Sequence, residues 1–309
     1  MKNNIISFND LGASGRIGNQ MFQFSALVNI ANVNKFNFMI QDPNNVSESK
    51  GEYVVNYFPE IKAISGLIFG KSNYKNLVDE NSGFIVFDND LLTLKENVNL
   101  IGYFQSLKYI NIDKNLIKKI FTFNEKYQSL SKEILDEIRL DKEIVFIHVR
   151  RSDYLKKKMY HYPLSLKYYK KAIKKLEENY LFIVFSDDSN WCKRQKIFKK
   201  KNVKFIQDIL QRYQFNLNRD ILEMCLMSNC DGAIISNSSY SWWGAWLQKN
   251  PSNIISPDKK NWFGYLYNFD ATDLIDSDWI SIADNKFRFY LYKFTSMVMK
   301  FTFFRLKNY

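Results

Sequence analysis

Short apolar runs alternate with amphipathic stretches along the second half of the chain. The runs predict strands at 144–149, 181–186, 203–206, 233–236 and 253–256. Between them, apolar residues recur at steps of three and four. This spacing predicts helices at 165–180, 191–201 and 219–229, and another from Ser239 or Ser241 through Leu247. Strands that alternate with helices form parallel sheets, so the pattern predicts an α/β domain.

The first half shows the same alternation less regularly. Strands are expected at 4–8 and 36–40, with a glycine-rich loop and a helix that starts near Ile17 between them. A strand, a glycine turn and a helix start are expected at 99–106, and a clear helix at 129–140. Within the weaker pattern of 41–97, residues 84–87 resemble a strand. We therefore expect two α/β domains with a boundary near residue 140.

Composition supports a soluble globular protein with an anionic partner. The 309 residues are 46% hydrophobic and 25% charged, which is ordinary for a soluble chain with two domains. The 44 Lys and Arg against 32 Asp and Glu give a net charge of +12, which favours a nucleotide sugar, an acidic membrane surface or a nucleic acid. Much of the excess lies in 286–309 and in one helix face at 167–175. Without a recognised binding motif, nucleic acid is not expected.

The cysteines, the histidines and the lack of targeting segments indicate in which compartment we expect the protein and which metal sites it lacks. Three cysteines, an odd number without metal-ligand spacing, predict a reducing compartment and no disulfide framework. Two histidines exclude a histidine-rich metal site. Neither a secretory signal nor a membrane-spanning run is visible, so we expect a cytoplasmic protein.

The densest polar cluster follows the strand at 144–149. His148, Arg150, Arg151 and Asp153 stand at its end, and two adjacent arginines are costly to place in a core. An arginine can hold a phosphate with two parallel hydrogen bonds, and open α/β sheets bind ligands outside the carboxyl ends of their strands. The pattern therefore favours a phosphate-bearing ligand. The alternative from this string alone is a solvated junction with surface ion pairs.

Two further turns could offer donors to an anion. The loop at 12–20 is flanked by a strand and a helix, yet it is neither a Walker loop nor GxGxxG, so on its own a tight turn into a packed helix is favoured. Asn237, Ser238 and Ser239 also follow a strand and begin a helix. Their small side chains can donate to a phosphate, and plain N-capping is the alternative. The tryptophans that follow are expected in the core.

Paired acids after two apolar runs raise the question of a metal site. Asp88-Asn89-Asp90 follows 84–87 and has the DxD pattern of metal-dependent glycosyltransferases. Asp-Asn is also ordinary turn chemistry, and a site with two arginines needs no cation to neutralise a diphosphate. We interpret this string, and Asp187-Asp188 after 181–186, as turns. No metal is expected.

Three motifs in the same order resemble glycosyltransferase family 11, the α-1,2-fucosyltransferases that use GDP-fucose. They are GRIGNQMFQF from Gly15, HVRRSDY from His148 and SNSSYSWWGAWL from Ser236, and NLIGYFQS from Asn99 resembles a further segment. The resemblance implies an α/β fold of GT-B type, with two Rossmann-like domains facing a cleft. Residues 1–140 would form most of the acceptor side, and residues 141–285 would hold GDP-fucose.

The resemblance also implies roles for single residues. Arg150 matches the arginine that contacts the donor β-phosphate and stabilises the charge that develops there. Asp153 would organise the arginines or accept the acceptor's proton. Asp220 and Glu223 both fit the place of the acid that reads guanine, and His148 lies near the guanine. The implied donor-binding residues are Gly18, Asn19, Gln20, His148, Arg151, Ser186, Asp187, Asp188, Asp220, Glu223, Asn237, Ser238 and Ser239.

The implied reaction is a single displacement with inversion that requires no metal and no cofactor. L-Fucose would pass from GDP-fucose to the 2-hydroxyl of a terminal β-galactose, on an oligosaccharide or a lipid-linked glycan, in bacterial surface polysaccharide or O-antigen synthesis. The alternatives are a fucosyltransferase of another linkage, such as α-1,6, and a non-catalytic relative that binds a GDP-sugar or a glycan.

Residues 286–309 differ from the rest of the chain. They hold six basic residues and no acid, and Lys286, Lys293, Lys300 and Lys307 recur every seven residues. This pattern predicts a basic amphipathic helix suited to an anionic membrane surface. The alternative is a helix packed on the enzyme or on a partner subunit. Peripheral contact with the inner face of the cytoplasmic membrane is therefore expected.

Overall fold

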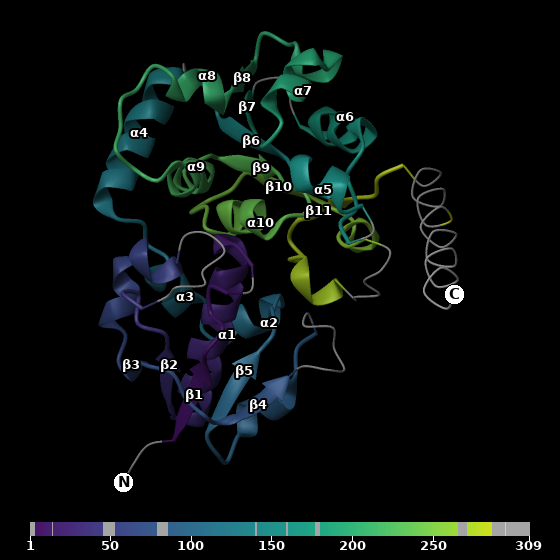
Figure 1. Cartoon of the computed structure of the whole chain (residues 1–309). Coiled ribbons are helices and arrows are strands. Elements are labelled where there is room, and N and C mark those ends of the chain that lie inside the picture. The colour runs from purple at the N-terminus through teal and green to yellow at the C-terminus, as the bar shows by residue number, and fades with distance from the viewer. Residues whose placement is uncertain are drawn as a thin grey trace, which may run out of the picture. The chain divides into compact units, whose positions relative to one another are not determined.

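The computed structural model describes residues 4–13, 15–45, 53–78, 86–139, 141–158, 160–176, 180–264, 271–285 and 294 (Figure 1). They divide into two compact units. Unit 1 holds the described residues up to Leu130 and those of 271–276, and unit 2 holds the others. The division falls inside helix α4 (Glu125–Arg139), whereas the sequence pattern placed it after that helix, near residue 140.

Unit 1 contains a parallel sheet of five strands in the described residues, in the order β3-β2-β1-β5-β4. The strands are β1 (Ile5–Phe8), β2 (Asn37–Ile40), β3 (Leu67–Phe69), β4 (Lys75–Val78) and β5 (Val98–Ile101). Helix α1 (Ile17–Asn34) connects β1 to β2, with fourteen of its residues buried. A strand, helix and parallel strand in this order form the βαβ unit that the sequence predicts.

Short helices complete unit 1. They are α2 (Leu107–Asn111), α3 (Lys114–Ile120), and the 3-10 helices η1 (Val54–Asn56), η2 (Pro59–Ala63), η3 (Asn89–Thr93) and η6 (Thr272–Leu274). Asp273 fixes the segment 271–276 here, because its carboxylate pairs with Lys108 at 2.9 Å and accepts from the Phe87 N–H at 3.2 Å. The structure therefore differs from the expected continuous domain that ends near residue 140, because unit 1 also contains the segment 271–276.

The strand expected at 84–87 is not formed where the structure can test it. Val86 and Phe87 lie outside any strand, and 84–85 fall outside the described residues. Instead, the Asp88 carboxylate accepts a hydrogen bond from the Asp90 N–H at 2.9 Å and begins η3. The DxD string thus uses its first aspartate as a helix cap.

Unit 2 contains a parallel sheet of six strands in the described residues, in the order β11-β10-β9-β6-β7-β8. The strands are β6 (Ile144–Val149), β7 (Leu181–Ser186), β8 (Val203–Phe205), β9 (Gly232–Ile234), β10 (Asn253–Pro257) and β11 (Ile280–Ile282). All six residues of β6 are buried between β7 and β9. A strand buried on both faces reads as a continuous apolar run, which is why the sequence predicts it well.

The helices of unit 2 cover this sheet (Figure 1). They are α5 (Ser152–Lys156), α6 (Leu166–Lys175), α7 (Ser189–Arg194), η4 (Lys196–Phe198), α8 (Ile206–Leu210), α9 (Arg219–Ser228), α10 (Ser239–Trp246) and η5 (Lys259–Asn261). The helix expected at 165–180 ends at Lys175, because Leu176 is extended. The helix expected at 191–201 begins earlier, because the Asp188 carboxylate caps α7. Trp242 and Trp243 are fully buried, which confirms their expected core position.

The strand order of unit 2 reverses between β6 and β9. From β6 the sheet grows through β7 to β8, and from β9 it grows the other way through β10 to β11. Ligands of open parallel sheets bind at such a switch point, outside the carboxyl ends of the two strands. Arg150 follows β6 and Asn237 follows β9, so these residues predicted from the sequence flank the switch point.

Candidate active site

Arg150 is fixed at the end of β6 by two carboxylates. Its Nη2 pairs with Asp153 at 2.9 Å and its Nε pairs with Asp187 at 3.3 Å. Burial lowers the pKa of this guanidinium, but the two aspartates outweigh that effect and the pKa is raised. The side chain is 19% exposed. Its Nη1 makes no hydrogen bond within the described residues, so one edge of the guanidinium remains available to an anion.

Arg151 has partners of its own. Its Nε pairs with Asp188 at 3.2 Å, and its guanidinium lies 3.4 Å from the ring centroid of Trp191. The same Asp188 caps α7 by accepting from the Trp191 N–H at 3.2 Å. The cap therefore places both the ring and the carboxylate that hold Arg151, and stacking on an aromatic face stabilises a guanidinium.

Asp187 connects the end of β7 to the turn after β6. Its two carboxylate oxygens accept from the N–H groups of Arg151 at 2.9 Å and Ser152 at 3.1 Å. Ser186 donates to the Val149 carbonyl at 2.8 Å and accepts from the Asp188 N–H at 3.0 Å. In the described structure, the predicted donor-binding string Ser186-Asp187-Asp188 thus holds the arginines in place.

Net charge alone does not make this cluster attractive to an anion. Two guanidinium groups face three carboxylates within it. An exposed basic run at 156–158 adds positive charge at the end of α5. An anion bound here would therefore be held mainly by directed hydrogen bonds from Arg150.

Two contacts connect β6 and its turn to the end of β9. The His148 Nδ1 lies 2.7 Å from the Ser236 Oγ, and the Tyr154 hydroxyl donates to the Asn237 carbonyl at 2.7 Å. Asn237 donates from its own amide to the carbonyls of Tyr162 and Trp262, each at 2.8 Å. The side chains of His148 and Asn237 are 4% and 3% exposed. Both side chains therefore support the backbone at the switch point from within the core.

The first turn of α10 adds backbone donors at the same switch point. Ser238 is the N-cap residue, its side chain makes no capping hydrogen bond, and the first turn from Ser239 carries no acid. Both serines are only partly buried. A helix N-terminus with this composition favours a negative charge nearby.

The two acids proposed to read guanine lie on α9 in different settings. Glu223 accepts from the Arg219 Nε at 2.8 Å and is 13% exposed. Burial raises the pKa of Glu223, although Arg219 acts in the opposite direction. Asp220 has an exposed side chain, and its carbonyl accepts a hydrogen bond from the Tyr240 hydroxyl. Tyr240 also lies beside His148, with ring centroids 5.7 Å apart.

Protonation of His148 is expected to destabilise the protein at acid pH. Burial, with a smaller effect from Arg150, lowers the pKa of this imidazole to about 3 from 6.5. Between these values the unfolded chain binds the extra proton and the folded chain does not. Stability is therefore lost as the pH falls, by up to about 1.4 kcal/mol per pH unit from this group.

Urea unfolding of the wild type and of His148→Gln from about pH 7 down to about pH 5 measures this contribution. The wild type should lose stability more steeply than the variant. Equal slopes would contradict the assignment of a neutral buried imidazole.

Gly18, Asn19 and Gln20 lie in unit 1, at the start of α1. The Gln20 side chain is fully buried and accepts from the Val54 N–H at 2.9 Å, while Asn19 accepts from the Gln105 amide at 2.7 Å. Gly15 has φ +96°, and a Cβ there would lie 2.4 Å from the Asn19 amide nitrogen. The glycine therefore lets the loop close tightly onto Asn19. This loop follows the carboxyl end of β1, the central strand of the unit 1 sheet, and ligands of open parallel sheets bind outside the carboxyl ends of their strands.

From the sequence, we also expect that no metal is bound and that no segment spans a membrane. Among the described residues, no group of three or more His, Cys, Asp or Glu side chains could hold a metal ion. No helix in the described ranges is both long and apolar enough to cross a bilayer. The predicted amphipathic tail at 286–309 lies outside the described residues except for Phe294, whose side chain is 64% exposed.

Sequence reasoning missed several contributors to the site. Trp191 supports Arg151, Ser236 holds His148, and the ring of His161 stacks on Tyr154 with centroids 4.3 Å apart. Only Ser236 carried a signal, because it directly precedes the turn at 237–239. Trp191 and His161 lie in stretches without a recognisable motif, so the sequence gives no signal for their contacts.

Comparison with known proteins agrees with the motifs. The family model described as glycosyl transferase family 11 matches residues 1–283. The chain is 27% identical to the O-antigen biosynthesis glycosyltransferase WbnK of Escherichia coli, over 81% of this chain and 93% of that protein. It is 37% identical to an alpha-1,2-colitosyltransferase of Escherichia coli, over 55% of this chain and 58% of that protein.

Solved structures agree on the fold. Fucosyltransferase NodZ from Bradyrhizobium is similar with a TM-score of 0.52 at 12% identity, covering 84% of this chain and 97% of that chain. A NodZ alpha-1,6-fucosyltransferase co-crystallized with GDP has a TM-score of 0.50 at 10% identity, covering 79% and 92%. The expected α/β fold with two parallel sheets, of GT-B type, is confirmed. Because the family model spans nearly the whole chain and the three motifs occur in order, this protein belongs to glycosyltransferase family 11.

Proposed function

We propose that the protein transfers L-fucose from GDP-fucose to the 2-hydroxyl of a terminal β-galactose on a glycan acceptor. The observation that carries the proposal is Arg150, fixed by two carboxylates at the switch point of unit 2 with one edge available to a phosphate. Similarity to an O-antigen glycosyltransferase supports a role in bacterial surface polysaccharide synthesis.

In the proposed reaction the acceptor oxygen attacks the anomeric carbon as the bond to GDP breaks. Negative charge then builds on the β-phosphate. Arg150 stabilises this charge, and the first turn of α10 adds backbone donors. We propose that no metal takes part, because preorganised hydrogen-bond donors can stabilise this charge.

Asp153 is assigned a positioning role in this proposal. Of the two roles that the sequence left open, organising an arginine agrees with the 2.9 Å pair between its carboxylate and Arg150. The acceptor hydroxyl releases its proton to water as the new glycosidic bond forms. Because the transition state carries positive charge on the sugar and has little bonding to the acceptor oxygen, the proton leaves late and the demand for a base is low.

For the guanine we propose Asp220 in preference to Glu223. Guanine presents N–H donors that a carboxylate can accept. The Asp220 carboxylate is exposed, whereas Glu223 is largely buried and already holds Arg219. Asp220→Asn should therefore weaken GDP binding more than Glu223→Gln does.

A second candidate donor is GDP-colitose, whose sugar lacks the 3-hydroxyl of fucose. This candidate rests on the 37% identity to a colitosyltransferase. A site that hydrogen-bonds the 3-hydroxyl discriminates strongly against the sugar without it, because buried partners are then left unpaired. The ratio of rates for the two donors therefore reports which sugar the site was built for.

The test is GDP release in EDTA from each donor, with and without galactose-ended acceptors. We expect release from GDP-fucose that depends on acceptor, with the new sugar on the galactose O2. Faster release from GDP-colitose would reassign the donor, and fucose at another hydroxyl would reassign the linkage. Release only after Mn²⁺ is added would contradict metal independence, and no release from either donor would refute the proposed transfer.

A further inference from the structure

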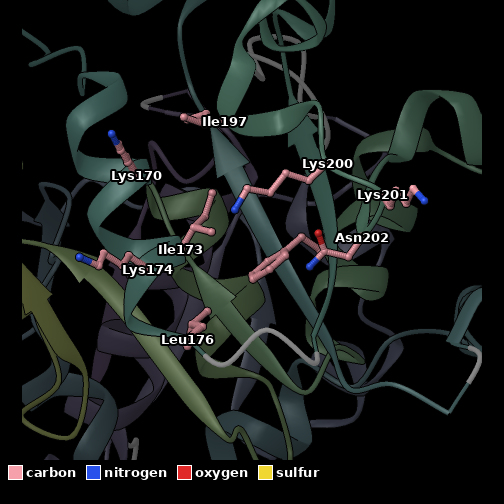
Figure 2. Close-up of a pocket in the computed structure, with 9 residues that line it drawn as sticks. Lys170, Ile173, Lys174, Leu176, Ile197, Lys200, Lys201 and Asn202 are labelled. Atoms are coloured by element: carbon pink, nitrogen blue, oxygen red, sulfur yellow. The ribbon is translucent and has the colours of Figure 1, made fainter.

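Unit 2 contains a pocket away from the arginine cluster. Its volume is about 590 Å³, and it is lined by α6, the start of β7 and the segment at 197–202 (Figure 2). Phe182 lines it near the amino end of β7, whereas Asp187 follows the carboxyl end. At about 3.3 Å per residue these positions are about 16 Å apart along the strand. The pocket is therefore separate from the candidate active site.

The floor of the pocket is apolar. Ile173 comes from α6, Leu176 directly follows that helix, Phe182 comes from β7 and Ile197 from η4. Leu176 and Phe182 are 8% and 2% exposed, while Ile173 and Ile197 are only partly buried. The volume lies within the range of about 300–1,000 Å³ that is typical of small-molecule sites. An apolar group seated here would shield these side chains further from water.

The rim of the pocket is basic. Lys170, Lys174, Lys200 and Lys201 line it, all exposed, and within the described ranges none of them forms an ion pair. In Figure 2, Lys200 extends across the pocket toward α6, while the other three ammonium groups point outward. Their flexible stems allow them to turn toward a ligand. Among the described residues, the lining therefore combines an apolar floor with four cations and no acid.

The surface around the pocket is basic as well. Exposed lysines continue along α6 and through the segment after α7, at Lys167, Lys175, Lys196 and Lys199. Glu177 and Glu178 follow Leu176 in the sequence and lie outside the described residues. Each lysine near an anionic membrane surface contributes to attraction, so such a face is drawn to acidic lipids.

We infer that this pocket binds an anionic membrane lipid, with the phosphate on the lysines and the start of an acyl chain on the apolar floor. Inorganic phosphate would satisfy the lysines but leave the floor unused. A nucleic acid would satisfy the charge of the face but not the apolar floor of the pocket. The lipid uses both features, and this inference does not depend on the donor or the linkage.

The test is sedimentation of the full-length protein with vesicles of phosphatidylcholine and phosphatidylglycerol. Lys170→Glu/Lys200→Glu changes the pocket rim. Lys62→Glu/Lys126→Glu makes the same change in net charge at exposed positions of unit 1. Both variants keep residues 286–309, so any contribution of that segment is common to them.

We expect the rim variant to bind at least about tenfold more weakly than the wild type, and the control to bind nearly as well as the wild type. Ile197→Ser should also weaken binding without a change in charge, with unfolding temperatures that confirm folding. GDP release with a soluble acceptor should stay unchanged in all three, which separates this site from the proposed function.

Three outcomes would overturn the inference. The wild type could fail to bind the anionic vesicles, or the rim and control variants could lose equal affinity, which would indicate net charge alone. Inorganic phosphate could also release the protein far better than chloride at the same ionic strength. That result would indicate a site for a free phosphate rather than a lipid.

Discussion

Arg150→Ala is expected to lower kcat by about 10² to 10³-fold while the protein stays folded. The lost interaction is a charged donor aimed at the leaving phosphate, and removal of one such donor typically costs this much. Arg150 is held at the end of β6 by Asp153 and Asp187, so its guanidinium needs little reorganisation during the reaction. Single-turnover measurements with saturating donor separate this loss from weaker donor binding.

Arg150→Lys is the informative second variant. It keeps the charge but loses the planar fork, so it cannot pair with both carboxylates and a phosphate in the same geometry. We expect it to recover only a small part of the lost rate. Rates close to the wild type in both variants, with folded protein shown by circular dichroism, would contradict the assignment of Arg150 to the leaving group.

The position of Arg150 is the part of the site that the sequence predicts well. A continuous apolar run marks β6 as a central strand, and the polar residues directly after it must lie at the edge of the sheet where ligands bind. The switch point follows from strand order, which the sequence does not specify. It became visible only when β9 paired with β6.

The contacts that hold the arginines could not be predicted in this way. Asp187 lies 37 residues after Arg150, and a pair of acids after a strand is equally compatible with a turn, a metal site or a nucleotide contact. The pairing of β7 with β6 brings Asp187 to the turn at Arg151. Similarly, the cap at Asp188 determines where Trp191 lies. The pairing of strands far apart in the sequence therefore determines which role each of these side chains has. The local sequence pattern determines only where the helices and strands form.

Asp187→Asn is expected to lower kcat by about a hundredfold, through the arginines rather than through direct contact with substrate. The two Asp187 oxygens accept from the N–H groups of Arg151 and Ser152, and one of them also pairs with the Arg150 Nε. An asparagine has only one accepting oxygen, so its amide nitrogen would face a donor. The turn should shift and release Arg150 from its orientation, with a loss of stability of about 1–3 kcal/mol.

A double-mutant cycle with Arg150→Ala tests this positioning role. If Asp187 acts through Arg150, adding Asp187→Asn to Arg150→Ala should lower kcat little further, because the effect has already been lost. Asp208→Asn is the matched control, since it removes an aspartate whose surface pair with Lys193 is half exposed. That change should leave kcat unaltered. Fully additive losses in the cycle would instead indicate that Asp187 contacts the donor itself.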